Sequence, residues 1–186
     1  MDLEGQTVIY GGSFNPPHMG HQMALLYLLE GLGADTIWLL PTDKHPFGKN
    51  LTHFDHRCAM CKLLAKPFGE RVVVQNLEKT VGDGHTITIV EHLQKQYPSR
   101  RFALAVGADI LKETHAWHRW QDIVERVLIV VLGREGYKEL EQTPLTLPAI
   151  SSSEVRQRIL ASRSLAGLVP KTIITYISEH QLYRGM

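Results

Sequence analysis

The sequence predicts an α/β fold: an open parallel sheet of five or six strands, with helices on both faces and a helical C-terminal segment. Short apolar runs rich in β-branched residues alternate with amphipathic stretches of helical length. Repeated strand–helix–strand order implies right-handed crossovers and a parallel sheet covered on both faces. Two further helical stretches follow the last strand. No repeat or linker interrupts this pattern, so we expect a single domain, residues 1–186.

The expected elements follow one another regularly. The strands are apolar, short and bounded by turn residues, which is typical of buried strands. They are QTVIY (6–10), DTIWLL (35–40), RVVVQ (71–75), RFALAV (101–106) and RVLIVVL (126–132). The helices between them are expected near 19–31, 55–66, 86–97 and 117–125. ISSSEVRQRILA (150–161) and PKTIITYISEH (170–180) complete the chain, and Pro170 stands where a first-turn proline is tolerated.

Composition and charge narrow the functional classes. Twenty Lys and Arg against nineteen Asp and Glu leave the surface nearly neutral, so we expect no nucleic-acid partner. No apolar run approaches the roughly 20 residues of a membrane span, and the acidic N-terminus lacks a signal-peptide core. Two cysteines provide no disulfide framework. We therefore expect a cytoplasmic protein with reduced thiols and no membrane partner; its oligomeric state, a homo-oligomer included, stays open.

The turn after the first strand, GGSFNPPHMGH (11–21), has the composition of an anion-binding site. It follows the carboxyl end of a parallel strand, the edge where open α/β sheets bind ligands. Gly11 and Gly12 let backbone N–H groups approach an oxyanion without a Cβ in the way. The next helix, expected to begin near residue 19, directs its positive end to the same place. Two adjacent prolines stiffen the loop.

His18 and His21 are the candidate reactive residues of this turn. They are three residues apart, so both rings share one face if the helix begins at His18. Two imidazoles beside a Gly-Gly turn suit a phosphate chain whose charge grows during a reaction. The alternative is that His18 caps the helix and His21 is an ordinary buried histidine. We favour the phosphate site, although the turn is neither a Walker loop nor a dinucleotide fingerprint.

A second anion-binding segment is expected at ISSSEVRQRI (150–159). Ser151 and Glu154 have the spacing of a capping box, which starts a helix. Ser152 and Ser153 add donors at the positive end of that helix, and Arg156 follows in the first or second turn. A serine-rich helix start is commonplace by itself, so this segment matters only together with the first.

The two segments together resemble the G-x-[ST]-F-[DN]-P-x-H-x-G-H and I-S-S-[ST]-x-[IV]-R signatures of the nucleotidylyltransferase superfamily. The resemblance covers nearly the whole chain, agrees with a Rossmann-like sheet, and looks closest to bacterial nicotinate-nucleotide adenylyltransferases. It implies transfer of AMP from ATP to nicotinate mononucleotide in NAD biosynthesis, with Mg²⁺ carried by the ATP phosphates. It implies catalytic roles for His18, His21 and Arg156. The ATP-binding residues that it implies are Gly11, Gly12, Ser13, Phe14, Gly107, Asp109, Ile150, Ser151, Ser152 and Ser153.

The acceptor site is implied by a third stretch. GADILKETHAWHRWQDI (107–123) is similar to that branch's G-x-D-x-L…W element. This places Gly107 and Asp109 near the ATP ribose and Trp117 beside the pyridine ring, where a flat indole suits stacking. Core packing is the alternative role for Trp117. The acceptor-binding residues implied overall are Thr86, Trp117, His118, Lys44, Lys49 and Arg57.

Two acceptor-side segments depart from the family pattern. PTDKHPFGK (41–49) stands where the family has P-P-H-K, and its lysines could equally be solvated loop residues. GHTITIV (84–90) replaces S-Y-T-x-D-T, keeping Thr86 but placing Ile89 at the second threonine. Adenylyl transfer is therefore better supported than the identity of the acceptor.

Three alternatives remain at this point. The same chemistry could act on nicotinamide mononucleotide or phosphopantetheine, or the chain could bind nucleotides without turnover. A metal-binding module could be built from His53, His56, Cys58 and Cys61, whose side chains are of the kind that bind zinc. We disfavour zinc because one continuous helix is expected there and free cysteines are often small core residues.

Overall fold

Six parallel strands form the sheet in the order β3-β2-β1-β4-β5-β6. The computed structural model describes residues 1–43, 51–136 and 146–184. The strands are β1 (Gln6–Gly12), β2 (Thr36–Pro41), β3 (Val72–Val74), β4 (Arg101–Gly107), β5 (Leu128–Arg134) and β6 (Thr146–Leu147). In the sheet, Ile9 of β1 is paired with Trp38 of β2 on one side and with Leu104 of β4 on the other. The expected open parallel sheet is confirmed, with β1 at its centre.

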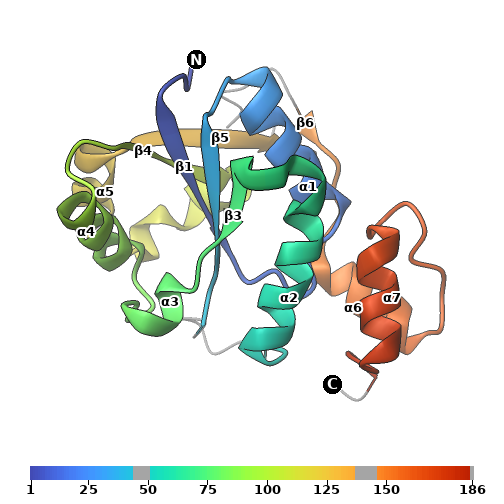
Figure 1. The fold of residues 1–186 in the computed structure, drawn as a ribbon. Coiled ribbons are helices and arrows are strands. Elements are labelled where there is room, and N and C mark those ends of the chain that lie inside the picture. Colours follow the sequence, from blue (N-terminus) through green and yellow to red (C-terminus); the bar gives the residue numbers. More distant parts are fainter. Residues whose placement is uncertain (44–50, 137–145, 185–186) are drawn as a thin grey trace.

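Helices cover both faces of this sheet (Figure 1). Along β1, Val8 and Tyr10 belong to one apolar layer and Ile9 to the other, because successive strand residues point to opposite faces. The first layer contains buried residues of α1, α2, α6 and α7, and the second contains those of α4 and α5. These helices are α1 (Met19–Leu26), α2 (Phe54–Ala65), α4 (Thr86–Gln96), α5 (Trp120–Arg126), α6 (Ser152–Leu160) and α7 (Lys171–Glu179).

Several short elements differ from the sequence-based expectations. The first helix is α-helical to Leu26 and continues as a π-helical turn, Tyr27–Gly31. Trp117 is extended and precedes α5, because a 3-10 helix, Ala108–Ala116, occupies the stretch after β4. Strand β6, helix α3 (Leu77–Thr80) and the 3-10 segment Lys66–Arg71 were not expected either. Within the described ranges, no helix is both long and apolar enough to cross a membrane.

Candidate active site

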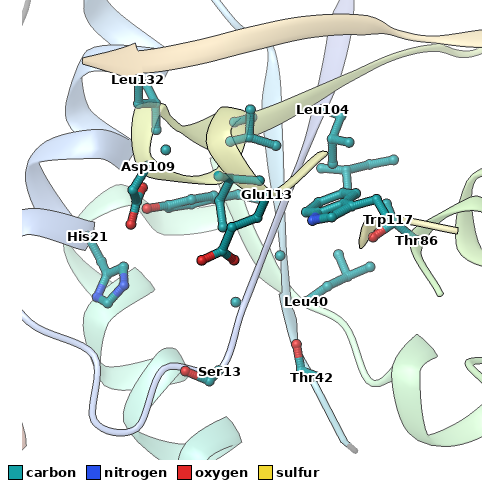
Figure 2. A pocket seen from close by; sticks show the side chains of 18 of the residues that line it. Ser13, His21, Leu40, Thr42, Thr86, Leu104, Asp109, Glu113, Trp117 and Leu132 are labelled. Atoms are coloured by element: carbon teal, nitrogen blue, oxygen red, sulfur yellow. The ribbon is translucent and has the colours of Figure 1, made fainter. Parts of the chain in front are cut away.

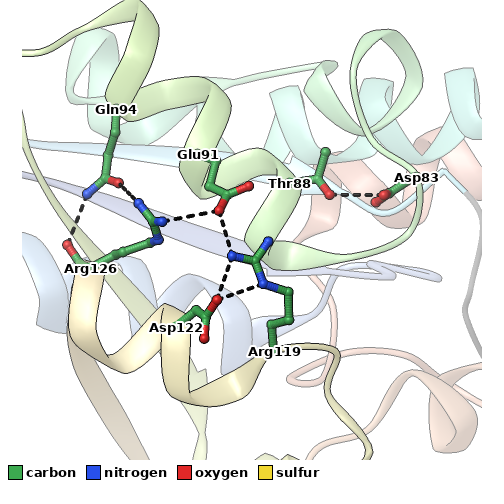
Figure 3. Close-up of polar contacts among 7 residues, drawn as sticks. All are labelled: Asp83, Thr88, Glu91, Gln94, Arg119, Asp122 and Arg126. Atoms are coloured by element: carbon green, nitrogen blue, oxygen red, sulfur yellow. Dashed lines mark hydrogen bonds and ion pairs between the residues drawn. The ribbon is translucent and has the colours of Figure 1, made fainter.

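A cavity of about 410 Å³ opens at the carboxyl ends of β1 and β4. It lies at the edge where parallel sheets bind ligands. Figure 2 shows His21 and Asp109 toward one end of this cavity and Trp117 and Thr86 toward the other. The expected site residues that line it are Gly11, Gly12, Ser13, His18, His21, Thr86, Gly107, Asp109, Trp117, His118 and Ile150.

The other expected residues occupy different places. Phe14 is buried, and its ring meets that of Tyr10 edge to face at 5.8 Å between centroids. Lys44 and Lys49 lie outside the described residues. The remaining described residues are absent from the cavity wall: Arg57, Ser151, Ser152, Ser153 and Arg156.

His18 and His21 stack at the start of α1, with ring centroids 3.7 Å apart. The backbone N–H of His18, the N-cap residue of α1, donates to Nδ1 of His21 at 3.1 Å, so the His21 side chain helps to cap this helix. With Nδ1 as an acceptor, the proton of neutral His21 resides on Nε2. In the described part of the chain, the buried Nδ1 of His18 has no hydrogen-bond partner. The pair therefore combines a helix cap with ring nitrogens that can meet a ligand.

Both imidazoles are neutral at physiological pH. Burial, together with the nearby Arg134 guanidinium, lowers the pKa of His18 to about 3. Burial, with His18 and Arg134 nearby, also holds the pKa of His21 well below its usual range. Neutral imidazoles can donate hydrogen bonds to phosphate oxygens without the cost of burying a charge in the free protein.

This protonation state predicts a loss of stability on acidification. Below pH 6.5 the unfolded chain gains protons on these histidines and the folded protein does not. Between pH 7 and pH 5 we expect the free energy of unfolding to fall by about 2 kcal/mol for each imidazole. Urea unfolding at pH 7, 6 and 5 measures the slope. A double variant, His18→Gln with His21→Gln, should lose most of this dependence; an unchanged slope would assign it to other groups.

Arg134, at the end of β5, is a cavity residue that sequence reasoning missed. Its guanidinium donates to Asp109 Oδ2 at 2.8 Å and to the carbonyl of Ile150 at 3.0 Å. It thereby connects the end of β5, the segment after β4 and the segment that begins at Ile150. Its place at the carboxyl end of a parallel strand is the signal that could have identified it.

Gly107 leaves the space that the Asp109 carboxylate occupies. A Cβ at residue 107 would clash with Asp109 Oδ1, which is the end of a side chain and can move. We expect Gly107→Ala to displace this carboxylate from Arg134, raise the KM for ATP about tenfold and change stability little. Initial rates at varied ATP measure this effect. An unchanged KM in Gly107→Ala would contradict the role of Asp109.

The segment that begins at Ile150 is hydrogen-bonded to the turn after β1. Ser151 Oγ accepts a hydrogen bond from the Glu154 N–H, which confirms the expected cap of α6. Ser152 Oγ donates to the Pro16 carbonyl at 2.8 Å, and Arg156 donates to the Asn15 carbonyl at 2.7 Å. The side chains of Ser152 and Arg156 therefore hold the loop that follows the Gly-Gly turn in place.

Arg57 braces the same loop from α2. It is buried, and its guanidinium donates to the carbonyls of Thr52 and Thr42 at 2.7 Å each and to that of Ser13 at 2.9 Å. Ser13 and Thr42 both line the cavity. Arg57 therefore affects the site by fixing the backbone that follows β1 and β2.

The far end of the cavity is aromatic and contains several titratable groups. Trp117 meets Trp120 edge to face at 5.4 Å, and the rings of His85 and His118 are 4.6 Å apart. Burial, together with the nearby Asp83 and Asp43, raises the pKa of Glu78, which lines the cavity, to about 7. An indole, two imidazoles and helix α4, which begins at Thr86, can enclose a flat heterocycle.

Three of the four residues of the suggested zinc module serve other contacts. His56 Nδ1 lies 2.9 Å from the Tyr176 hydroxyl, and the exposed His53 pairs with Asp55. Cys61 is buried in the core, where burial raises the pKa of its thiol. A thiol held protonated is a poor zinc ligand, since the thiolate is the form that binds metal.

Known proteins resemble this chain over almost its whole length. Residues 9–158 match the cytidylyltransferase-like family. A protein of Anaeromyxobacter dehalogenans named "Probable nicotinate-nucleotide adenylyltransferase" is 43% identical, with 97% of each chain covered. One of Myxococcus xanthus with the same name is 35% identical, covering 96% of this chain and 94% of the relative.

Solved structures show the same fold. Plasmodium falciparum nicotinic acid mononucleotide adenylyltransferase complexed with NaAD superposes with a TM-score of 0.82 at 20% identity, covering 97% of this chain and 98% of the other. The family match and the full-length relatives settle the classification. The chain belongs to the cytidylyltransferase-like family and, within it, to the nicotinate-nucleotide adenylyltransferases.

Proposed function

We propose that the protein transfers AMP from ATP to nicotinate mononucleotide, forming deamido-NAD and pyrophosphate in NAD biosynthesis. The observation that carries this proposal is one continuous cavity with His21 and its stacked partner His18 toward one end and Trp117 and Thr86 toward the other. Such a cavity suits a phosphate chain and an aromatic heterocycle at once. The names of the full-length relatives and the NaAD complex of the structural neighbour support this assignment.

The reaction requires positioning more than proton transfer. The 5′-phosphate of the acceptor is already an anion, so it can attack the α-phosphorus of ATP without a general base. A phosphorus–oxygen bond forms to the acceptor, the bond to the β-phosphate oxygen breaks, and pyrophosphate leaves with that electron pair. Catalysis then rests on alignment and on donors aimed at the developing charge. His21 Nε2–H and the His18 ring are the donors we assign.

The two arginines near the phosphate end take different parts in this proposal. Arg134 lines the cavity, and its guanidinium brings positive charge to the wall beside His18 and His21. Arg156 holds the Asn15 carbonyl and would approach a phosphate from behind the turn loop. We propose that Arg156 positions the loop, while Arg134 orients Asp109 toward the ATP ribose.

Mg²⁺ enters the proposed reaction as part of the substrate, the MgATP complex. Asp109 is held by Arg134, and the groups assigned to the phosphates are N–H donors and imidazoles rather than carboxylates. Phosphate oxygens and water are then the natural ligands of the ion, as in many nucleotide enzymes.

A pyrophosphate-release assay with ATP and one acceptor at a time tests the proposal. Nicotinate mononucleotide should give the highest kcat/KM, followed by nicotinamide mononucleotide, with phosphopantetheine inactive. ATP binding without pyrophosphate release from any acceptor would identify a nucleotide-binding relative instead. A preference for phosphopantetheine would overturn the assignment of the aromatic end.

We also propose a cytoplasmic location for this enzyme. Its two cysteines are free thiols, Cys61 in the core and Cys58 partly buried. Unpaired thiols of this kind suit a reducing compartment.

A further inference from the structure

Glu113 places a carboxylate in the middle of the cavity. It lies on the 3-10 helix Ala108–Ala116, which joins β4 to Trp117, and its side chain lines the cavity wall. Figure 2 shows this carboxylate pointing into the cavity, where in that view it lies between His21 at one end and Trp117 at the other. Across the described ranges, no hydrogen bond or ion pair engages it, whereas Asp109 on the same helix is bound to Arg134.

The shape of the acceptor says what would meet this carboxylate. In a pyridine mononucleotide, the ribose joins the heterocycle to the 5′-phosphate. If the ring stacks near Trp117 and the phosphate lies near His21, the ribose occupies the space between them, where Figure 2 shows Glu113. A ribose presents two neighbouring hydroxyl groups that donate hydrogen bonds. A carboxylate only accepts them and would repel a phosphate, so the hydroxyls are its matching partners.

We propose that Glu113 binds the ribose hydroxyls of the acceptor nucleotide and so sets the distance between its ring and its reacting phosphate. This inference rests on the proposed function, because it assumes an acceptor that carries a ribose. Glu113 is exposed and the wall around it is formed by other residues, so its side chain can be removed without opening the core. The competing role for a free carboxylate beside ATP is to bind the Mg²⁺ that ATP brings.

A double cycle that combines a variant of Glu113 with acceptors lacking a ribose hydroxyl tests the contact directly. Glu113→Ala should lower kcat/KM for nicotinate mononucleotide about 10- to 100-fold, with the KM for ATP nearly unchanged. With the parent enzyme, kcat/KM for acceptors lacking the 2′- or 3′-hydroxyl should be lower by a similar factor. In Glu113→Ala this penalty should shrink to about twofold or less, because its partner is gone. Glu113→Gln keeps one acceptor oxygen, so its kcat/KM should lie between that of the parent and that of Glu113→Ala.

Calorimetric binding of the same nucleotides, with a non-hydrolysable ATP analogue present, gives a readout independent of turnover. His115→Ala is the matched control, since His115 is exposed on the same 3-10 helix and is outside the cavity wall. An equal deoxy penalty in parent and Glu113→Ala would overturn the proposal, as would full rescue of the variant by raised Mg²⁺. If no pyridine mononucleotide bound the parent, the proposed function would fail as well; binding with an unchanged penalty would refute the role of Glu113 alone.

Discussion

Replacing His21 by asparagine is expected to lower kcat about 100-fold or more while the protein stays folded. The Asn carbonyl oxygen can take the place of Nδ1 and accept the His18 N–H, which preserves the cap of α1. What the variant loses is the Nε2–H donor that faces the cavity. Removing one well-placed donor to a developing charge costs two to three orders of magnitude in enzymes of many classes.

The KM for ATP should change much less than kcat, because a donor that acts mainly in the transition state contributes little to substrate binding. Single-turnover pyrophosphate release measures the chemical step, and urea unfolding at pH 7 checks the fold. His21→Gln should recover part of the rate, since its terminal amide reaches further than that of asparagine. His18→Ala should show a loss of similar size.

His53→Asn is the control for histidine loss, because the His53 side chain is 72% exposed on the surface. Its kcat should equal that of the parent. A His21→Asn protein that turned over at the parent rate would show that the stacked pair only caps a helix, which is the alternative that the sequence leaves open.

Much of the fold was predictable because its strands are long enough to show their character. The expectation for 101–106 coincides with β4 except for Gly107, and α1 begins at Met19 as expected. The missed elements are short: β6 spans two residues and α3 spans four. Periodicity needs more residues than that to separate a helix or strand from a loop. Their form depends on what they pack against.

The site residues also divide into those that the sequence could predict and those that it could not. Residues in the turn after β1 could be placed because the end of a parallel strand and the start of a helix converge there regardless of detail. Arg134 and Glu113 were missed because they enter from a strand end and a 3-10 helix whose directions depend on tertiary packing. Arg57 shows the converse. Its family position suggested a contact with the acceptor, yet its hydrogen bonds go to the protein backbone.

Arg57→Met is expected to lower the free energy of unfolding by about 3–5 kcal/mol, an unusually large effect for one side chain. Methionine keeps the apolar stem but leaves the carbonyls of Ser13, Thr42 and Thr52 without the donors they have in the parent. Each hydrogen bond from a charged group contributes about 1.5–3 kcal/mol, and bonds that share one guanidinium do not add fully. Urea unfolding at pH 7 measures the difference.

Arg57→Lys should recover little of this loss. Burial already lowers the pKa of Arg57, and a buried ammonium would be harder still to keep charged. A single ammonium also lacks the separate Nε–H and terminal N–H donors with which the guanidinium binds three carbonyls. Lys62→Met is the matched control, because Lys62 is exposed on the same helix, and its effect should stay within about 0.5 kcal/mol.

The same variant separates stability from function. Ser13 and Thr42 line the cavity at the ends of β1 and β2, so loosening their carbonyls should raise the KM for ATP even at temperatures where Arg57→Met is fully folded. A destabilised variant with unchanged kinetic constants would limit Arg57 to the core. An unchanged free energy of unfolding would mean that the three carbonyls find other donors. A lower free energy of unfolding together with a raised KM for ATP would show that one buried guanidinium holds the two strand ends in the register that ATP requires.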